Sequence, residues 1–166
     1  MPVVINSGSG NQGMTCSLPV IEYAKELKLS KDKLYRALVV SNLVAIHQKS
    51  YIGSLSAYCG AVSAACGAGA AIAWLNGGDY EAVARTITNA LANTSGMVCD
   101  GAKASCAAKI AASVDAGILG YHMYMKGQQF YGGDGIITKG VEKTIANVGR
   151  LGKEGMRETN EEIIKI

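Results

Sequence analysis

The fold depends on one stretch of small residues, SLSAYCGAVSAACGAGAAIAWLNGG, at positions 54–78. It lies within residues 50–78, which carry no formal charge and are numerous enough to span a bilayer. Large aliphatic side chains are few in this run, however, and Gly67 and Gly69 weaken any helix that contains them. We therefore expect no membrane span but a helix over residues 53–75 that is buried on all sides in a protein core.

The rest of the chain is expected to surround this helix within one domain. With 166 residues, 49% of them hydrophobic and 17% charged, the chain can form a single sizeable core. Apolar periodicity predicts further helices over residues 14–27, 31–48, 80–92, 102–116, 138–147 and 158–166. Only residues 3–5 have the character of a strand. The predicted fold is all-α, a compact single-domain helical bundle of residues 1–166 around a buried Ala/Gly-rich central helix.

Particular residues mark the expected ends of these helices. Ser30, Asp79 and Thr138 are typical N-caps, and Pro19 suits the first turn of a helix. Several glycines after residue 116 predict irregular chain and turns; these are Gly117, Gly120, Gly127, Gly132, Gly133 and Gly135.

Composition excludes some classes of function and narrows the compartment. A net charge of +3 without any run of Lys or Arg argues against a nucleic-acid partner. Five cysteines are an odd number, and the N-terminus has no secretory signal, so a disulfide framework is not expected. These features favour a reducing compartment, and we expect a cytoplasmic protein.

A Gly-rich loop, NSGSGNQG at residues 6–13, matches the dinucleotide pattern G-x-G-x-x-G. That pattern binds nucleotides only within a strand–helix–strand unit, and helical segments follow here instead. Successive Gly and Ser amides ahead of a helix also form an anion-binding nest, which suits a carboxylate or a phosphate. A flexible loop near the chain end is the alternative that the residues leave open.

Four of the five cysteines fall between residues 54 and 106. We expect Cys59 and Cys66 to share one face of the central helix, two turns apart. Cys99 and Cys106 flank the turn DGAKAS, where a helix N-terminus and Lys103 favour a thiolate or a bound anion.

Plain packing is the alternative for every cysteine, because free cysteine often behaves as a small buried hydrophobe. It is the favoured interpretation for Cys66, while Cys16 stays open between packing and a site role. Zinc is a weak candidate metal for these cysteines, because there is no C-x₂-C pair and only two histidines.

Two segments carry a resemblance to known enzymes: LSAYCGAVSAACG at residues 55–67 and GMVCDGAKASCA at residues 96–107. Both resemble the iron–sulfur L-cysteine desulfidases and, more distantly, the α portion of the iron–sulfur L-serine dehydratases. The loop at residues 6–13 looks like the Gly-rich segment that opens this α portion. From Cys59 to Cys99 is forty residues and from Cys99 to Cys106 is seven, which is closer to the desulfidase pattern.

This resemblance implies a 4Fe-4S cluster held by Cys59, Cys99 and Cys106, with one iron left without a protein ligand. The implied reaction is β-elimination from L-cysteine, or alternatively L-serine, to pyruvate and ammonia without pyridoxal phosphate. Lys103 and Asp100 are the implied catalytic candidates, orienting the substrate or tuning the cluster, with plain surface residues as the alternative. The implied contacts to the substrate carboxylate come from the Gly-rich loop: Asn6, Ser7, Gly8, Ser9, Gly10 and Gly13.

Members of this family are much longer and carry an additional N-terminal portion with further active-site groups. We therefore expect this chain to be the C-terminal part of a longer enzyme or a subunit with a separate partner, and to be nearly inactive alone. The oligomeric state stays open, with a homodimer among the alternatives. The competing hypothesis is a non-catalytic helical module whose cysteines are structural or redox-sensing.

Overall fold

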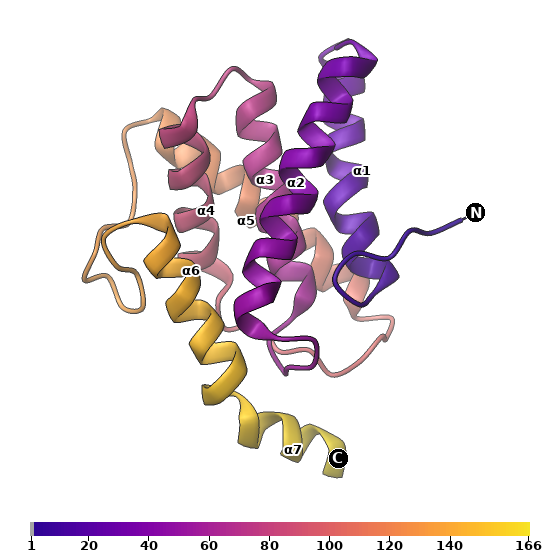
Figure 1. Ribbon diagram of the computed structural model, residues 1–166, viewed down its shortest axis with the longest axis vertical. Helices are drawn as coiled ribbons and strands as arrows, with labels where there is room; N and C mark the ends of the chain where they lie inside the picture. The colour runs from indigo at the N-terminus through magenta and orange to yellow at the C-terminus, as the bar shows by residue number, and fades with distance from the viewer. Residues whose placement is uncertain (1) are drawn as a thin grey trace.

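The buried helix α3 (Gly60–Leu75) forms the centre of the computed structural model, which describes residues 2–166 (Figure 1). Every residue of α3 except Gly60 and Trp74 is buried, although the helix contains few large side chains. Four helices pack around it: α1 (Gly10–Glu26), α2 (Lys31–Ile52), α4 (Tyr80–Thr94) and α5 (Cys106–Met125). The prediction of an all-α domain around an Ala/Gly-rich central helix is confirmed.

Glycines of α3 allow three of these neighbours to approach its backbone. A Cβ atom on Gly60 would lie 2.5 Å from the Gln12 side chain of α1, and one on Gly67 would lie 2.3 Å from the Ser41 carbonyl of α2. A Cβ on Gly69 would lie 2.8 Å from Cα of Gly117 in α5. Small residues are therefore required where the helices cross, because the interior is already close-packed.

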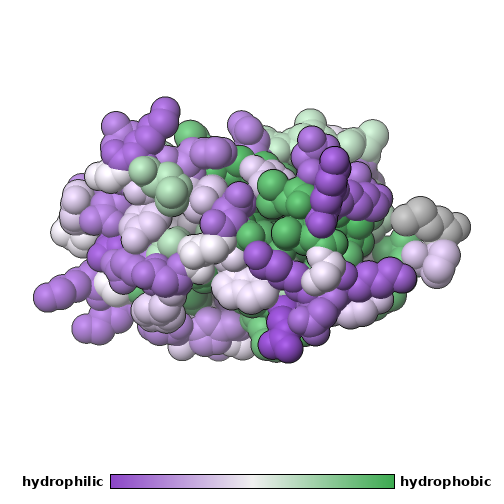
Figure 2. All heavy atoms as spheres, turned by 90° about the horizontal axis from the view of Figure 1, so that it is seen from above, coloured by the Kyte–Doolittle hydropathy of each residue, from purple (hydrophilic) through white to green (hydrophobic). Residues whose placement is uncertain are grey.

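A second group of helices extends the bundle at its C-terminal end. Helix α6 (Val141–Arg150) packs against α2 and α4 and continues without a break into a π-helical turn, η1 (Leu151–Gly155). The final helix, α7 (Arg157–Lys165), contacts η1 and has no buried residue, so it extends away from the bundle (Figure 1). Figure 2 shows that apolar side chains reach the surface between hydrophilic ones on the end seen from above.

Polar side chains cap three helices at their N-termini. The oxygens of Ser9, Ser30 and Asp79 accept hydrogen bonds from the amides three residues on, at 3.1, 3.3 and 2.9 Å. Each satisfies an amide that has no partner within the helix. The predicted caps at Ser30 and Asp79 are confirmed, whereas the predicted cap at Thr138 is wrong because α6 begins after Gly140.

The predicted extent of the central helix is also wrong at its N-terminal end. Helix α2 continues to Ile52 and ends at Gly53, whose φ of +94° turns the chain, and residues 53–59 are irregular. Cys59 is consequently the N-cap of α3, and it does not share a helix face with Cys66. Residues 3–5 form no strand, and none is present elsewhere in residues 2–166.

Helix α5 starts later and ends later than its sequence pattern predicts. Gly117 and Gly120 were expected to lie in irregular chain after its end, yet both lie inside the helix. They are contact positions instead, since a Cβ on either would lie 2.9 Å from a backbone carbonyl of a neighbouring helix. Pro19 likewise lies in the interior of α1, because that helix starts as early as Gly10.

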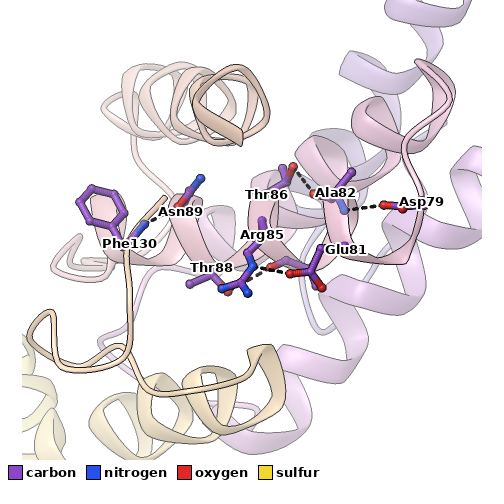
Figure 3. Close-up of polar contacts among 9 residues, drawn as sticks. Asp79, Glu81, Ala82, Arg85, Thr86, Thr88, Asn89 and Phe130 are labelled. Atoms are coloured by element: carbon purple, nitrogen blue, oxygen red, sulfur yellow. Dashed lines mark hydrogen bonds and ion pairs between the residues drawn. The ribbon is translucent and has the colours of Figure 1, made fainter. Parts of the chain in front are cut away.

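One buried polar side chain ties the loop after α5 to the bundle. Asn89 of α4 is only 1% exposed, and its Oδ1 accepts a hydrogen bond from the Phe130 amide at 3.1 Å (Figure 3). Its Nδ2 donates to the Gly120 carbonyl of α5 at 3.0 Å. Asn89 therefore satisfies two backbone groups that come from different segments.

None of the helices in the described part of the chain combines the length and the apolar character that crossing a membrane requires.

Replacement of Gly69 by alanine tests the contact between α3 and α5. The new methyl group would meet the Gly117 backbone, so the helices must separate, and we expect a loss of about 1–3 kcal/mol of unfolding free energy. Gly96→Ala is the matched control, because a Cβ there meets no atom within 4 Å. Thermal unfolding of the two variants checks this; equal melting temperatures would contradict the close helix contact.

Replacement of Asn89 by leucine tests the tie to the loop. It leaves the Gly120 carbonyl and the Phe130 amide without partners, and we expect it to lower the unfolding free energy by about 2–4 kcal/mol. Asn93→Leu, on an exposed position of the same helix, is the control and should change little. Urea unfolding measures both, and an Asn89→Leu chain as stable as the control would show that the bonds contribute nothing.

Candidate active site

A pair of backbone hydrogen bonds brings two of the predicted cluster cysteines together. Tyr58 and Val98 form an isolated antiparallel bridge between the segment before α3 and the segment after α4. In this bridge the Cys59 amide donates to the Met97 carbonyl at 3.1 Å, and the Cys99 amide donates to the Ala57 carbonyl at 2.7 Å. Residues forty positions apart in the chain are therefore neighbours in space.

The third cysteine joins them from the start of α5. Cys106 is the first residue of that helix, and its Sγ accepts a hydrogen bond from the Lys103 amide at 3.4 Å. The chain between Cys99 and Cys106 turns at Gly101, whose φ is +91°, as the sequence predicts. Cys59 and Cys106 thus both stand at helix N-termini, where the helix dipole favours a thiolate.

These three cysteines line one cavity of about 200 Å³. The Gly-rich loop lines the same cavity through Ser7, Gly8 and Ser9, and two lysines, Lys49 and Lys109, contribute positive charge. No Asp or Glu is among the described residues that line it. The cavity is therefore rich in thiols and cations, a combination that suits an anionic ligand or a soft metal centre.

The Gly-rich loop is an ordered turn rather than a flexible segment. Asn6 and Ser9 exchange two backbone hydrogen bonds, at 3.3 and 3.2 Å, around Ser7 and Gly8, whose φ angles are +50° and +101°. Gln12 supports the turn by donating from Nε2 to the Ser7 carbonyl and to the Ser9 hydroxyl, each at 3.2 Å. The turn is thereby held against the cavity.

The other predicted loop residues lie behind this turn and do not line the cavity. Asn6 is buried and donates from Nδ2 to the Asn42 side chain at 2.7 Å. Gly10 and Gly13 allow the N-terminal segment to pass, because a Cβ on Gly13 would lie 1.8 Å from the Val4 carbonyl. Their contact with a substrate stays a prediction, and the structure gives each a packing role.

The two predicted catalytic residues lie at the edge of the site. Asp100 forms an ion pair with Lys109 at 2.5 Å, and neither Asp100 nor Lys103 lines the cavity. The hydrogen bond from Lys109 lowers the pKa of Asp100, and the same bond raises the pKa of Lys109. Their catalytic roles stay predictions, and Asp100 orients a lysine that does reach the cavity.

Lys49 and Lys109 are cavity residues that the sequence pattern did not identify. Helix α2 was expected to end at residue 48, which would have left Lys49 in a solvated loop. Continuation of the helix to Ile52 instead makes Lys49 a buried residue beside the thiols. A signal was present in the sequence, since Lys49 is the last charged residue before the run of 29 uncharged ones.

Burial changes the titration of groups around the cavity. It raises the pKa of the Cys59 thiol, while the amides of Ala61 and Val62 in the first turn of α3 act against this rise. It lowers the pKa of Lys49, an effect that negative charge on Cys99 and Cys59 opposes. Lysine and thiolates thus favour each other's charged forms.

The two remaining cysteines lie away from the cavity. Cys16 and Cys66 are completely buried in helices, and burial raises the pKa of each thiol to about 12. Cys66 Sγ faces the Ile87 carbonyl of α4 at 3.7 Å, and Cys16 Sγ faces the Ala64 carbonyl of α3 at 3.9 Å. Both behave as small packing residues.

The donor set of the cavity fits an iron–sulfur cluster better than a single ion. Among residues 2–166, no three His, Cys, Asp or Glu side chains are grouped so that they could hold one metal ion. Ligands of a cluster bind different irons, so three thiols around a cavity can hold it without meeting at one point. Thiolates at helix N-termini and nearby lysines would also offset the negative charge of such a group.

Comparison with known proteins identifies relatives that are similar over the whole chain. The UPF0597 protein of Desulfitobacterium hafniense is 68% identical over all 166 residues, which are 39% of that protein. The UPF0597 protein of Lachnoclostridium phytofermentans is 61% identical over all 166 residues, or 40% of its length, and that of Treponema denticola 53% over 165 residues, or 38%. The chain thus spans about two fifths of the length of these relatives. No solved structure matches it significantly.

The serine dehydratase alpha chain family matches residues 1–165, nearly the whole chain. This match includes both cysteine-bearing segments and the Gly-rich turn that meet at the cavity. The chain belongs to the serine dehydratase alpha chain family.

Proposed function

We propose that the chain is the cluster-bearing domain of an iron–sulfur lyase that removes the β-substituent of a small amino acid, with L-cysteine preferred to L-serine. The observation that carries this proposal is the meeting of Cys59, Cys99 and Cys106 with the Gly-rich turn at one cavity. The spacing of the three cysteines resembles the pattern of the L-cysteine desulfidases, and this resemblance supports L-cysteine. The name of the matched family favours L-serine as the second candidate.

A 4Fe-4S cluster on the three thiols would supply an iron without a protein ligand, a Lewis acid that polarises the leaving sulfur or oxygen. The residues of the chain have separate tasks. The turn at Ser7 to Ser9 offers hydroxyl and amide donors to the substrate, and Lys109 adds positive charge, held in place by Asp100. In the overall reaction, L-cysteine and water give pyruvate, ammonia and hydrogen sulfide.

We infer that the remaining length of the longer relatives covers part of this domain and supplies groups that the cavity lacks, the base among them. An apolar stripe on α2 supports such a covering portion; its members, each 48–60% exposed, are Tyr35, Val39, Leu43 and Ile46. A homodimer is the alternative occupant of this stripe. We place the protein in the reducing cytoplasm, where cluster thiols stay reduced.

Anaerobic reconstitution with iron and sulfide tests the proposed ligands. We expect broad visible absorbance in the parent chain and its loss in Cys59→Ser, Cys99→Ser and Cys106→Ser. Cys66→Ser is the control and should retain the absorbance, because Cys66 is buried away from the cavity. Stoichiometric zinc, or no metal at all in the parent chain, would support a structural or redox module instead.

Alkylation with iodoacetamide at pH 8 gives an independent test. In the iron-free chain we expect Cys99 and Cys106, which are partly exposed, to react first. Cys16 and Cys66 should react only on unfolding, because their pKa values of about 12 leave little thiolate. Mass spectrometry should show Cys99 and Cys106 protected after reconstitution, and unchanged rates there would count against a cluster at this site.

A further inference from the structure

Lys49 stands out among the described lysines because its side chain is largely buried and none of the described Asp or Glu residues pairs with it. It lies in the last turn of α2, and only 9% of its surface is exposed. None of the ion pairs between described residues involves it, whereas Lys109, the other lysine of the cavity, is paired with Asp100. Lys49 is therefore the cation of this site that no carboxylate of the described chain neutralises.

The ammonium group of a side chain as buried as that of Lys49 loses part of its hydration, and without a carboxylate it gains no ion pair in return, which lowers stability. Burial accordingly lowers the pKa of Lys49. Replacement by an apolar side chain of similar shape would remove this penalty, so its presence calls for an anion that arrives at the site. The cavity that Lys49 lines also presents the turn at Ser7 to Ser9, and none of the described residues that line it carries a carboxylate.

We propose that Lys49 is a substrate-binding residue whose ammonium group pairs with the α-carboxylate of the amino acid in this cavity. This inference rests on the proposed function, because it takes an amino acid as the ligand. The thiols are the competing partners, since Cys99 and Cys59 both influence Lys49. Lys109 also responds to the charge of Cys59 and Cys106, so Cys99 is the thiol that competes with the carboxylate for Lys49.

The decisive experiment compares L-serine with L-serine methyl ester, in which the carboxylate is esterified, at a pH low enough that both amino groups are protonated. Calorimetric titration of the reconstituted chain should show that the parent prefers L-serine by about 10–100-fold, as expected for a hydrogen bond between charged groups. Lys49→Met should abolish this preference by weakening the binding of L-serine, with the binding of the ester unchanged. Lys49→Arg should keep part of it, and Lys143→Met, an exposed control of equal charge change, should keep all of it.

Two further readouts, the iron content and the melting temperature, separate this inference from the proposed function. The iron content is the first. If Lys49→Met lowers the iron content but keeps the preference for the acid, Lys49 serves the cluster and the inference is wrong. If the parent chain takes up no iron, the proposed function fails, and the same two titrations are then made on the iron-free chain. If the iron-free parent chain prefers L-serine to the ester and Lys49→Met does not, the result would still support binding of the carboxylate by Lys49. If the parent chain binds both probes equally, the inference is overturned.

The melting temperature of the iron-free chain is the second readout. Because none of the described carboxylates pairs with Lys49, Lys49→Met should raise the melting temperature by about 2–6 °C, whereas Lys143→Met should leave it nearly unchanged. A lower melting temperature in Lys49→Met would mean that the lysine supports the fold, and this would contradict the inference.

Discussion

The candidate site depends on two backbone hydrogen bonds between residues 57–59 and residues 97–99. They hold Cys59, at the N-terminus of α3, beside Cys99, in the loop that leads to α5. Because these bonds are made by backbone groups, the pairing of the two segments does not depend on the cysteine side chains that line the cavity. The first turn of α5 then adds Cys106. Residues of α1, the turn before it and α2 line the rest of the cavity.

This arrangement requires a rigid frame, and the small residues of α3 provide it. Gly67 and Gly69 allow the backbones of α2 and α5 to lie against the central helix, so the helix ends that carry Lys49 and Cys106 reach the same cavity. Close helix packing thus sets the positions of the chemical groups. The same close packing buries Cys66, so its thiol does not reach the cavity.

Sequence patterns predict the central features of this fold but miss its local detail. The composition of α3 was enough to predict a buried helix, because a segment apolar on every side must be covered. The extent of α5 could not be predicted, because Gly117 and Gly120 act through contacts with distant helices rather than through local propensity. The two cysteine-bearing segments were identifiable by their resemblance to known enzymes, whereas Lys49 was missed because α2 was expected to end before it.

Mössbauer spectroscopy of the chain reconstituted with ⁵⁷Fe tests whether the three cysteines hold a cluster with one iron that has no protein ligand. A cluster held by three cysteines has one iron without a protein ligand, and this iron should respond to the substrate separately from the others. The account predicts that addition of L-cysteine or L-serine to the reconstituted chain shifts the signal of one iron in four. Four equivalent irons whose signals do not change on addition of either amino acid, or iron bound without a cluster, would contradict a cluster with one open iron.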